Sequence, residues 1–410
     1  MEHQQLIPHL FRTEYRKIVS VLCRYFGIDR IELAEDIASE TFFSASHTWA
    51  VKGLPPNPVA WLYTVAKNKA KNQLRRGNLF ASKITPEIQT TAASLYNYQP
   101  DMSPQGINDS QLQMMFTICH PAISTEVQVG LALRILCGFG IDEIADAFLS
   151  NKETINKRLY RAKQKLREEN IKIEMPGPIE INQRLKPVLT TIYLLFNEGY
   201  YSASSNTPLR KDLCLEAMRL CTMLIENPET NKPPVNALLA LMCFHASRFD
   251  ARVGASGEPV LYDDQDTSLW DTDLISKGAY FLHCAATGTE LTQFHLEATI
   301  AYWRTQRLNT REQWQTVLGL YNQLLQIAYT PVAALNRAYV LSKVEGNEAA
   351  IVEVEKLALT DNQFYFMLLG ELYLGIDKQR AKGNFERALA LAKAEGDRAI
   401  IKRKIALLLS

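Results

Sequence analysis

Two short stretches concentrate positive side chains, which bind phosphate groups and the acceptor atoms of nucleic-acid bases. The chain has 410 residues and a formal net charge of only +1, yet residues 151–168 (NKETINKRLYRAKQKLRE) carry seven Lys or Arg against two Glu. Residues 41–86 contain no Asp or Glu, but they contain Lys52, Lys67, Lys69, Lys71, Arg75, Arg76 and Lys83. Cations at this density can replace the counterions of a phosphate backbone. A solvated face of a helical bundle is the alternative for either stretch alone.

Metal chemistry has little support in the sequence. The seven cysteines form no C-x-x-C pair, and the adjacent pairs Cys119-His120 and His283-Cys284 lack further residues at ligand spacing. An Asp-rich loop suggests calcium, but counting from Asp264 the sixth position is Leu269 and the twelfth is Ile275. We therefore expect no metal and no cofactor, with the aspartates capping helices or forming ion pairs with Arg248 and Arg252.

Catalysis is not indicated either. Glu198, His245 and Asp266 could line a small-molecule pocket or a hydrolytic site. The sequence shows no nucleophile arrangement, phosphate-binding loop or metal signature to accompany them. We predict that the protein is not an enzyme.

Helical periodicity positions the cations of residues 151–168. Ile155, Leu159, Ala162 and Leu166 form one apolar stripe, and the pair Ser150 and Glu153 predicts a capping box that starts the helix near residue 151. A short helix, DEIADAFL, precedes it closely, as in a helix-turn-helix whose second helix enters the major groove. The residues expected to face DNA are Lys152, Thr154, Asn156, Lys157, Arg158 and Arg161.

The other basic stretch, residues 41–86, contains a second predicted helix start. Asn57 is the expected N-cap and Pro58 the first helical residue. Cations interleaved with aromatic rings suit nucleic acid with exposed bases, because bases stack on rings while cations follow the phosphates. The residues expected to bind are Trp61, Lys67, Asn68, Lys71, Arg75 and Arg76, although Trp61 alone could equally be a core residue.

Nearly every segment has the helical period, so the predicted fold class is all-α. A Ser, Thr, Gln and Pro-rich linker is expected over residues 81–109, and a second boundary at Met175-Pro176-Gly177-Pro178. No apolar run is long enough to cross a bilayer, and the N-terminus lacks the features of a secretory signal. We expect a cytoplasmic protein without a membrane partner.

Two segments resemble a known family. The segment WLYTVAKNKAKNQLRR resembles the promoter-melting helix of sigma-70-type factors, and ELAEDIASETFFSA resembles their polymerase-binding helix. Residues 124–168 resemble sigma region 4, in the order found in extracytoplasmic-function sigma factors. The resemblance implies region 2 at 1–80, a linker at 81–109 and a region 4 helix-turn-helix at 110–174.

Partners and residue roles follow from this resemblance. It implies binding to core RNA polymerase, at the beta-prime clamp and the beta flap, and to promoter DNA in duplex and melted form. Asp36, Glu40 and Phe42 would bind polymerase, and residues 49–57 would capture a flipped base. The Trp61 to Arg76 set would read the minus-10 element, and the Lys152 to Arg161 set the minus-35 element.

The second half of the chain resembles the C-terminal extension of one such subgroup, at 175–290, followed by tetratricopeptide-like repeats at 291–410. The pattern Ala381, Phe385 and Ala388 after Gly370 fits a pair of packed repeat helices. We expect regulation in cis and a possible protein or peptide ligand of the repeats. The candidate regulatory residues are Asn197, Glu198, Tyr200, Asp264, Asp266, Trp270 and Asp271.

Two other functions remain open at this point. A helix-turn-helix regulator that acts without polymerase would explain residues 151–168 but not residues 32–76. A small-molecule sensor or enzyme in the C-terminal half would place the activity beyond residue 179.

Overall fold

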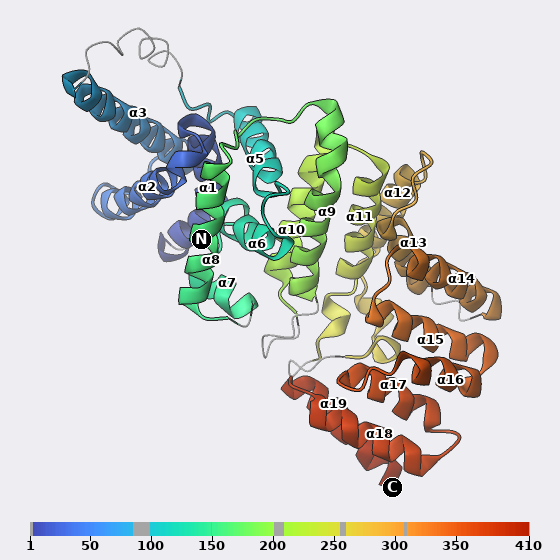
Figure 1. The fold of residues 1–410 in the computed structure, drawn as a ribbon. Helices are drawn as coiled ribbons and strands as arrows, with labels where there is room; N and C mark the ends of the chain where they lie inside the picture. Colours follow the sequence, from blue (N-terminus) through green and yellow to red (C-terminus); the bar gives the residue numbers. More distant parts are fainter. Residues whose placement is uncertain are drawn as a thin grey trace. The chain divides into compact units, whose positions relative to one another are not determined.

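The computed structural model describes residues 3–84, 99–148, 150–200, 209–254, 260–306 and 310–409, whose repeating secondary structure is helical (Figure 1). This confirms the predicted all-α fold. The chain divides into two compact units, Met1–Leu194 and Leu195–Ser410. The division between the two units falls after residue 194, inside helix α9 (Pro178–Tyr200). Within the described ranges, no helix combines the length and the apolar character that a membrane span requires.

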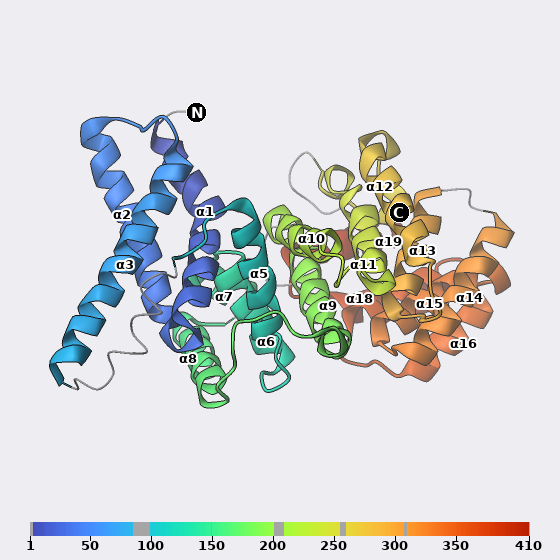
Figure 2. The same ribbon diagram turned by 90° about the horizontal axis from the view of Figure 1, so that it is seen from above.

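Unit 1 is built around its first helix. The elements of this unit before α9 are α1 (His3–Phe26), η1 (Ile28–Arg30), α2 (Ile31–Lys52), α3 (Pro58–Ile84), α5 (Pro104–Ile118), α6 (Thr125–Leu131), the π-helical turn η3 (Ala132–Leu136), α7 (Ile141–Ala147) and α8 (Lys152–Glu168). Helix α1 packs against α2 and α3 as well as against α5 and η3 (Figure 2). Ile18 and Leu22 of α1 are completely buried as a result.

Local capping sets the starts of the two basic helices. Asn57 Oδ1 accepts a hydrogen bond from the Ala60 amide at 2.9 Å, and α3 begins at Pro58, as predicted. The cap of α8 is Asn151, whose Oδ1 accepts from the Thr154 amide at 2.8 Å. The prediction that Ser150 caps this helix was therefore wrong by one residue, since Asn151 offers a carboxamide oxygen at the correct position.

The linker is shorter than predicted at both ends. Helix α3 continues to Ile84, and α5 already begins at Pro104. Ser103 caps α5 by accepting from the Gly106 amide at 3.1 Å, and Pro104 occupies the first helical position. Residues 85–98 lie outside the described ranges. Only residues 99–103 of the described linker are therefore non-helical.

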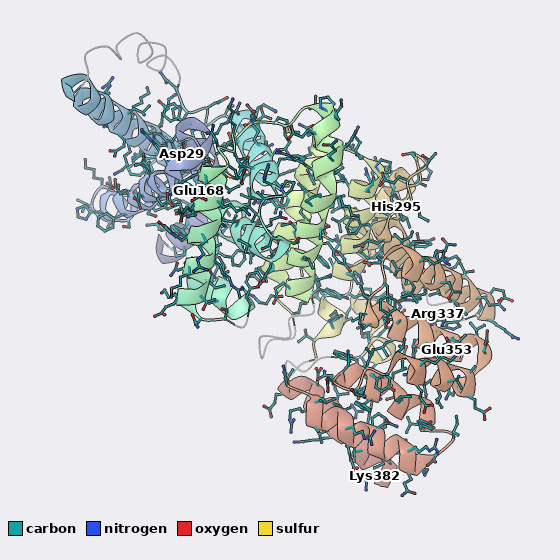
Figure 3. All side chains as sticks on the ribbon, viewed as in Figure 1. Asp29, Glu168, His295, Arg337, Glu353 and Lys382 are labelled. Carbon is teal, nitrogen blue, oxygen red and sulfur yellow. The ribbon has the colours of Figure 1, made fainter. Side chains whose placement is uncertain are left out.

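Unit 2 consists of successive helices with short connections. After α9 they are α10 (Lys211–Glu226), α11 (Pro233–Ala246), η4 (Asp250–Arg252), η5 (Tyr262–Asp264), η6 (Thr267–Leu269), α12 (Thr272–Ala285), α13 (Gln293–Gln306), α14 (Arg311–Ile327), α15 (Pro331–Glu345), α16 (Asn347–Leu357), α17 (Gln363–Tyr373), α18 (Lys378–Leu391) and α19 (Glu395–Leu409). Neighbouring helices pack in sequence order, and Arg337 of α15 pairs with Glu353 of α16 at 3.4 Å (Figure 3).

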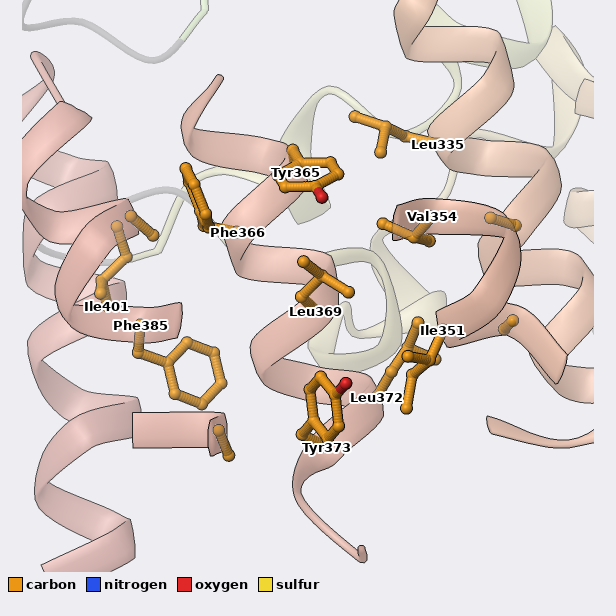
Figure 4. Packing of buried hydrophobic residues seen from close by; sticks show 14 of the residues in the cluster. Leu335, Ile351, Val354, Tyr365, Phe366, Leu369, Leu372, Tyr373, Phe385 and Ile401 are labelled. Atoms are coloured by element: carbon orange, nitrogen blue, oxygen red, sulfur yellow. The ribbon is translucent and has the colours of Figure 1, made fainter. Parts of the chain in front are cut away.

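Helices α17 and α18 pack closely, and Phe385 of α18 projects toward α17 (Figure 4). Phe385 of α18 is completely buried. A Cβ atom added to Gly370 would lie only 2.6 Å from the nearest carbon of the Phe385 ring. Ala381 and Ala388 are also completely buried. The small-residue and aromatic pattern read from the sequence therefore corresponds to real packing between these two helices.

Replacing Gly370 with Ala is expected to destabilise unit 2 by about 1–3 kcal/mol, because the new methyl group overpacks against Phe385. The matched control is Gly383→Ala in α18, where nothing lies within 4 Å of the added Cβ. That change should stabilise the helix by roughly 0.5–1 kcal/mol. Urea unfolding measures both, and equal effects of the two substitutions would contradict the close approach.

Candidate nucleic-acid interface

Helix α8 turns one side to the core and the other to solvent. Ile155, Leu159, Ala162 and Leu166 are buried, which confirms the predicted apolar stripe. The predicted DNA-facing residues Lys152, Asn156, Lys157, Arg158 and Arg161 are exposed, and Thr154 is half-buried at the first turn. The structure therefore leaves five of the six predicted residues accessible to solvent.

Acidic neighbours hold two of these cations at the surface. Lys152 pairs with Asp142 of α7 at 3.0 Å, and Arg158 pairs with Glu126 of α6. All four side chains are substantially exposed, and such surface ion pairs contribute little to stability. Either cation can therefore exchange its acidic partner for another anion at little cost in stability. Until then the acid holds the cationic side chain in place.

The predicted residues of α3 vary in exposure. Asn68 and Arg75 are exposed, while Trp61, Lys67 and Lys71 are half-buried. The side chain of Arg76 lies outside the described residues. The Trp61 ring meets the buried ring of Trp49 edge-to-face, with centroids 5.4 Å apart.

Residues 49–57 join the end of α2 to the start of α3. Trp49 and Trp61 therefore brace the two ends of this connection. Aromatic pairs of this kind contribute about 0.5–1.5 kcal/mol beyond the area they bury. The tryptophan considered for base stacking thus has a structural partner as well.

Helix α2 exposes an acidic and aromatic face. Asp36 and Glu40 are exposed, and Glu40 pairs with Lys69 of α3 at 3.0 Å. Phe42 is only 5% exposed and packs against Phe11, with ring centroids 5.1 Å apart. Its expected role at the surface is therefore corrected, because the ring is part of the core of unit 1.

Two exposed aromatic residues were missed in the sequence. Phe43 of α2 is 76% exposed, and Tyr160 of α8 is 60% exposed beside the cationic face. The signal for Tyr160 was its position outside the apolar stripe of α8. For Phe43 the sequence did not show which of the two adjacent phenylalanines is exposed.

The regulatory candidates of unit 2 are distributed between core and surface. Tyr200 is completely buried, and Arg248 Nη2 donates to its hydroxyl at 3.0 Å. Trp270 is buried with the Arg248 guanidinium 6.0 Å from its ring centre. Asn197 and Glu198 are half-buried, whereas Asp264 is exposed. Tyr200 and Trp270 therefore belong to a buried aromatic and arginine cluster, whereas Asp264 lies at the surface.

The Asp-rich loop caps helices. Asp266 Oδ1 accepts from the Ser268 amide, and Asp271 Oδ1 accepts from the Leu274 amide, both at 2.9 Å. The expected capping role is confirmed for these two. The ion pairs expected with Arg248 are not seen among the described residues, since Arg248 faces aromatic rings instead. No group of three or more His, Cys, Asp or Glu with the arrangement of a metal site occurs in the described ranges.

His245 lies beside this arginine cluster. Its Nδ1 accepts from Arg248 at 3.2 Å, and burial together with the charges of Arg248, Arg252 and Arg304 holds the pKa of His245 well below its ordinary value. The imidazole is therefore neutral in the folded protein at neutral pH.

Comparison with known proteins gives matches for both halves of the chain. Residues 10–79 match the model of sigma-70 region 2, and residues 184–286 match a family of unknown function, DUF6596. The chain is 32% identical over 393 residues to the uncharacterized protein R00370 of Rhizobium meliloti, covering 94% of this chain and 92% of that protein. It is 23% identical over 167 residues to the RNA polymerase sigma factor YlaC of Bacillus subtilis, covering 41% of this chain and 93% of that protein. No solved structure matches.

The two adjacent phenylalanines of α2 should respond differently to truncation. Phe42→Ala is expected to lower the free energy of unfolding of unit 1 by about 3–5 kcal/mol, because it opens a cavity beside Phe11. Phe43→Ala should change it by less than about 0.5 kcal/mol, because its ring is already in solvent. Thermal and urea unfolding measure both changes. A large loss of unfolding free energy in Phe43→Ala would contradict the placement of this ring in solvent.

Unit 2 should lose stability as the pH falls below about 6.5, the ordinary pKa of histidine in an unfolded chain. Unfolded His245 takes up a proton there, whereas the folded residue, with its lowered pKa, stays neutral, so the proton favours unfolding. His245→Gln should reduce this dependence, and part of it should remain because burial also lowers the pKa of His295 in the same unit. The exposed His283 is the control, and the idea fails if His283→Gln flattens the curve equally.

Proposed function

The chain is a sigma-70-type factor and belongs to the family that includes R00370 of Rhizobium meliloti, and on this basis we propose that it directs core RNA polymerase to promoters with two elements. The region 2 match covers the acidic helix α2 and most of α3, and α3 carries one of the two cationic surfaces. The second cationic surface, on α8, lies outside this match.

The observation that best supports this proposal is the placing of two separate cationic faces in one compact unit. The face of α8 would read the minus-35 element through Asn156, Lys157, Arg158 and Arg161, since Asn pairs with adenine and Arg with guanine in the major groove. Lys152 and Thr154 lie at the first turn, where they would contact the backbone.

Helix α3 would engage the minus-10 element as it melts. Asn68 and Arg75 are exposed along it, and Trp61, Lys67 and Lys71 lie beside them. Flipping a base costs a few kcal/mol, which stacking and edge contacts at residues 49–57 would offset. Asp36, Glu40 and Phe43 of α2 would bind the beta-prime clamp, and region 4 the beta flap. No step requires bond-making by this chain, so we propose no enzymatic activity.

The second unit would regulate this activity in cis. Its helices match the family of unknown function at 184–286 and continue as the packed pairs α14 to α19. Stacked helix pairs form extended surfaces for peptides and proteins. We propose that these tetratricopeptide-like repeats bind a protein or peptide signal, with no small-molecule cofactor.

Retention by core polymerase distinguishes this proposal from a regulator that binds duplex DNA alone. The full chain should co-purify with core polymerase, and Asp36→Arg should weaken retention by an order of magnitude or more, because it reverses an exposed charge on α2. The control is Asp29→Arg in η1, an exposed acid off this helix. No retention of the wild type would reject the proposal.

Salt dependence tests the face of α8. Arg161→Ala should reduce the slope of log binding constant against log salt by up to about 0.9 for promoter duplex, because a cation in the groove also displaces counterions from nearby phosphates. Lys402→Ala in α19 removes an equally exposed cation outside the proposed face and should leave the slope unchanged. An unchanged slope in Arg161→Ala would remove this residue from the interface.

A further inference from the structure

The last two helices of the chain concentrate positive charge. Residues 378–410 hold nine Lys or Arg against three Asp or Glu, whereas residues 347–377, directly before them, hold one Lys against six Asp or Glu. The sign of the charge therefore changes between α17 and α18. Helices α18 and α19 pack against each other as the final pair of unit 2 (Figure 1). We call residues 378–409 the cationic hairpin.

The cations of the hairpin fall into two groups. Arg380, Lys382 and Lys404 each form an ion pair with a nearby carboxylate. Arg398 donates to two carbonyls at the C-terminal end of α18 and so closes that helix. The others are exposed, and none of them forms an ion pair with the described residues: Lys378, Arg387, Lys393, Lys402 and Arg403.

Helix α19 packs its apolar residues in the core and exposes cations. Ile401 is buried, and Ile405 packs against the same apolar cluster. Lys402 and Arg403 are exposed, and Leu407, one turn after Arg403, is 67% exposed. The accessible side of α19 therefore offers two cations beside one leucine.

This arrangement does not suit a lipid surface. A helix that binds a bilayer buries an apolar face between the headgroups and the acyl chains. The apolar residues Ile401 and Ile405 of α19 already pack against the core of unit 2. The exposed cations therefore call for an anionic partner in solution.

The neighbouring charge distinguishes between two kinds of anionic partner. Duplex DNA carries one negative charge per about 1.7 Å and continues in both directions. Helices α18 and α19 are each only about 20 Å long at about 1.5 Å per residue. A duplex that extends along the helix stack also meets the acidic residues 347–377, which repel phosphate. A short acidic protein segment can stay within the hairpin and can also cover Leu407.

We propose that the cationic hairpin binds an acidic segment of a partner protein, which deepens the signal-binding role given to the repeats above and rests on it. Carboxylates form charge-assisted hydrogen bonds with Lys and Arg, and Arg binds them in bidentate geometry. Complementary charge speeds the encounter with such a partner and disfavours partners of the same sign. The acidic residues 347–377 limit the site on one side, because they repel the carboxylates of the partner.

Carbodiimide coupling of a synthetic decaglutamate peptide to the full chain tests the location of the site. The reagent joins a carboxylate to a lysine amine in contact with it, and mass spectrometry identifies the lysine. Links should form at Lys393 and Lys402 with about fivefold or higher yield than at Lys277, an exposed lysine of α12 in the same unit. Equal yields at the three lysines would overturn the proposal.

Duplex DNA in excess separates the hairpin from the DNA-binding faces proposed above. Links at Lys157 of α8 should disappear when the duplex competes for this exposed cation, whereas links at Lys402 should persist. Loss of the Lys402 links would make the hairpin a nucleic-acid surface and overturn the proposal. Persistence of the Lys157 links would instead count against the function proposed for α8 and leave the hairpin proposal standing.

Two further probes test the chemistry of the partner. Decaglutamine has the same length without the charge and should bind about tenfold or more weakly than decaglutamate. Vesicles of phosphatidylcholine and phosphatidylglycerol should not sediment the chain through the hairpin. Equal binding of the two peptides, or sedimentation that Lys402→Glu with Arg403→Glu abolishes, would refute an acidic protein segment as the partner.

Charge reversal gives an independent measurement that needs no polymerase. Lys402→Glu combined with Arg403→Glu should weaken the binding of fluorescein-labelled decaglutamate about tenfold or more, with duplex DNA present throughout. The matched control combines Lys277→Glu with Arg311→Glu, which reverses an exposed lysine and an exposed arginine elsewhere in unit 2. Equal losses in the two variants would show a dependence on net charge alone and overturn the proposal.

A neutral variant guards against misfolding. Lys402→Gln combined with Arg403→Gln removes both charges without adding repulsion, and circular dichroism shows whether each variant is folded. Its affinity for decaglutamate should fall about threefold or more. Unchanged affinity in this folded variant would remove α19 from the site and refute the proposal.

Discussion

The carboxylate of Glu35 is the constraint on which the arrangement of unit 1 depends. It receives Arg134 and Lys163, which lie 99 and 128 residues further along the chain, on two different elements. A sheltered carboxylate with two cations is costly to separate, so it favours one position of η3 and α8 against α2. This contact therefore helps to position the cationic face of α8 relative to α2.

Around that contact, several cations of α3 and α8 form exposed ion pairs. Lys152, Arg158 and Lys69 each pair with an exposed acid from a neighbouring helix. Exposed pairs of this kind contribute little to stability and are easily exchanged for phosphate. Apolar packing below holds the helices: Leu159 and Leu166 under α8, and Leu62 and Ala66 under α3, are all buried. The apolar side of each helix thus packs in the core, and the proposed nucleic-acid-binding side faces solvent.

Local features were predictable from the sequence, and long-range ones were not. The start of α3 followed from Asn57 and Pro58, because capping depends on residues three apart. The choice between Phe42 and Phe43 depended on which ring faced Phe11, which lies 31 residues before Phe42, and periodicity alone did not resolve it. Glu32 and Glu35 carried no sequence signal, since their partners are distant in the chain. The early start of α5 was signalled by Ser103-Pro104, a capping pair inside a segment otherwise typical of a linker.

Transcription in vitro from purified components tests the central claim most directly. Full chain and core polymerase, incubated with a library of promoter fragments, should yield transcripts from defined start sites that share two sequence elements. Core polymerase without the chain should give no such starts. Absence of any start site that depends on the chain, with polymerase shown to be active through another sigma factor, would contradict the account.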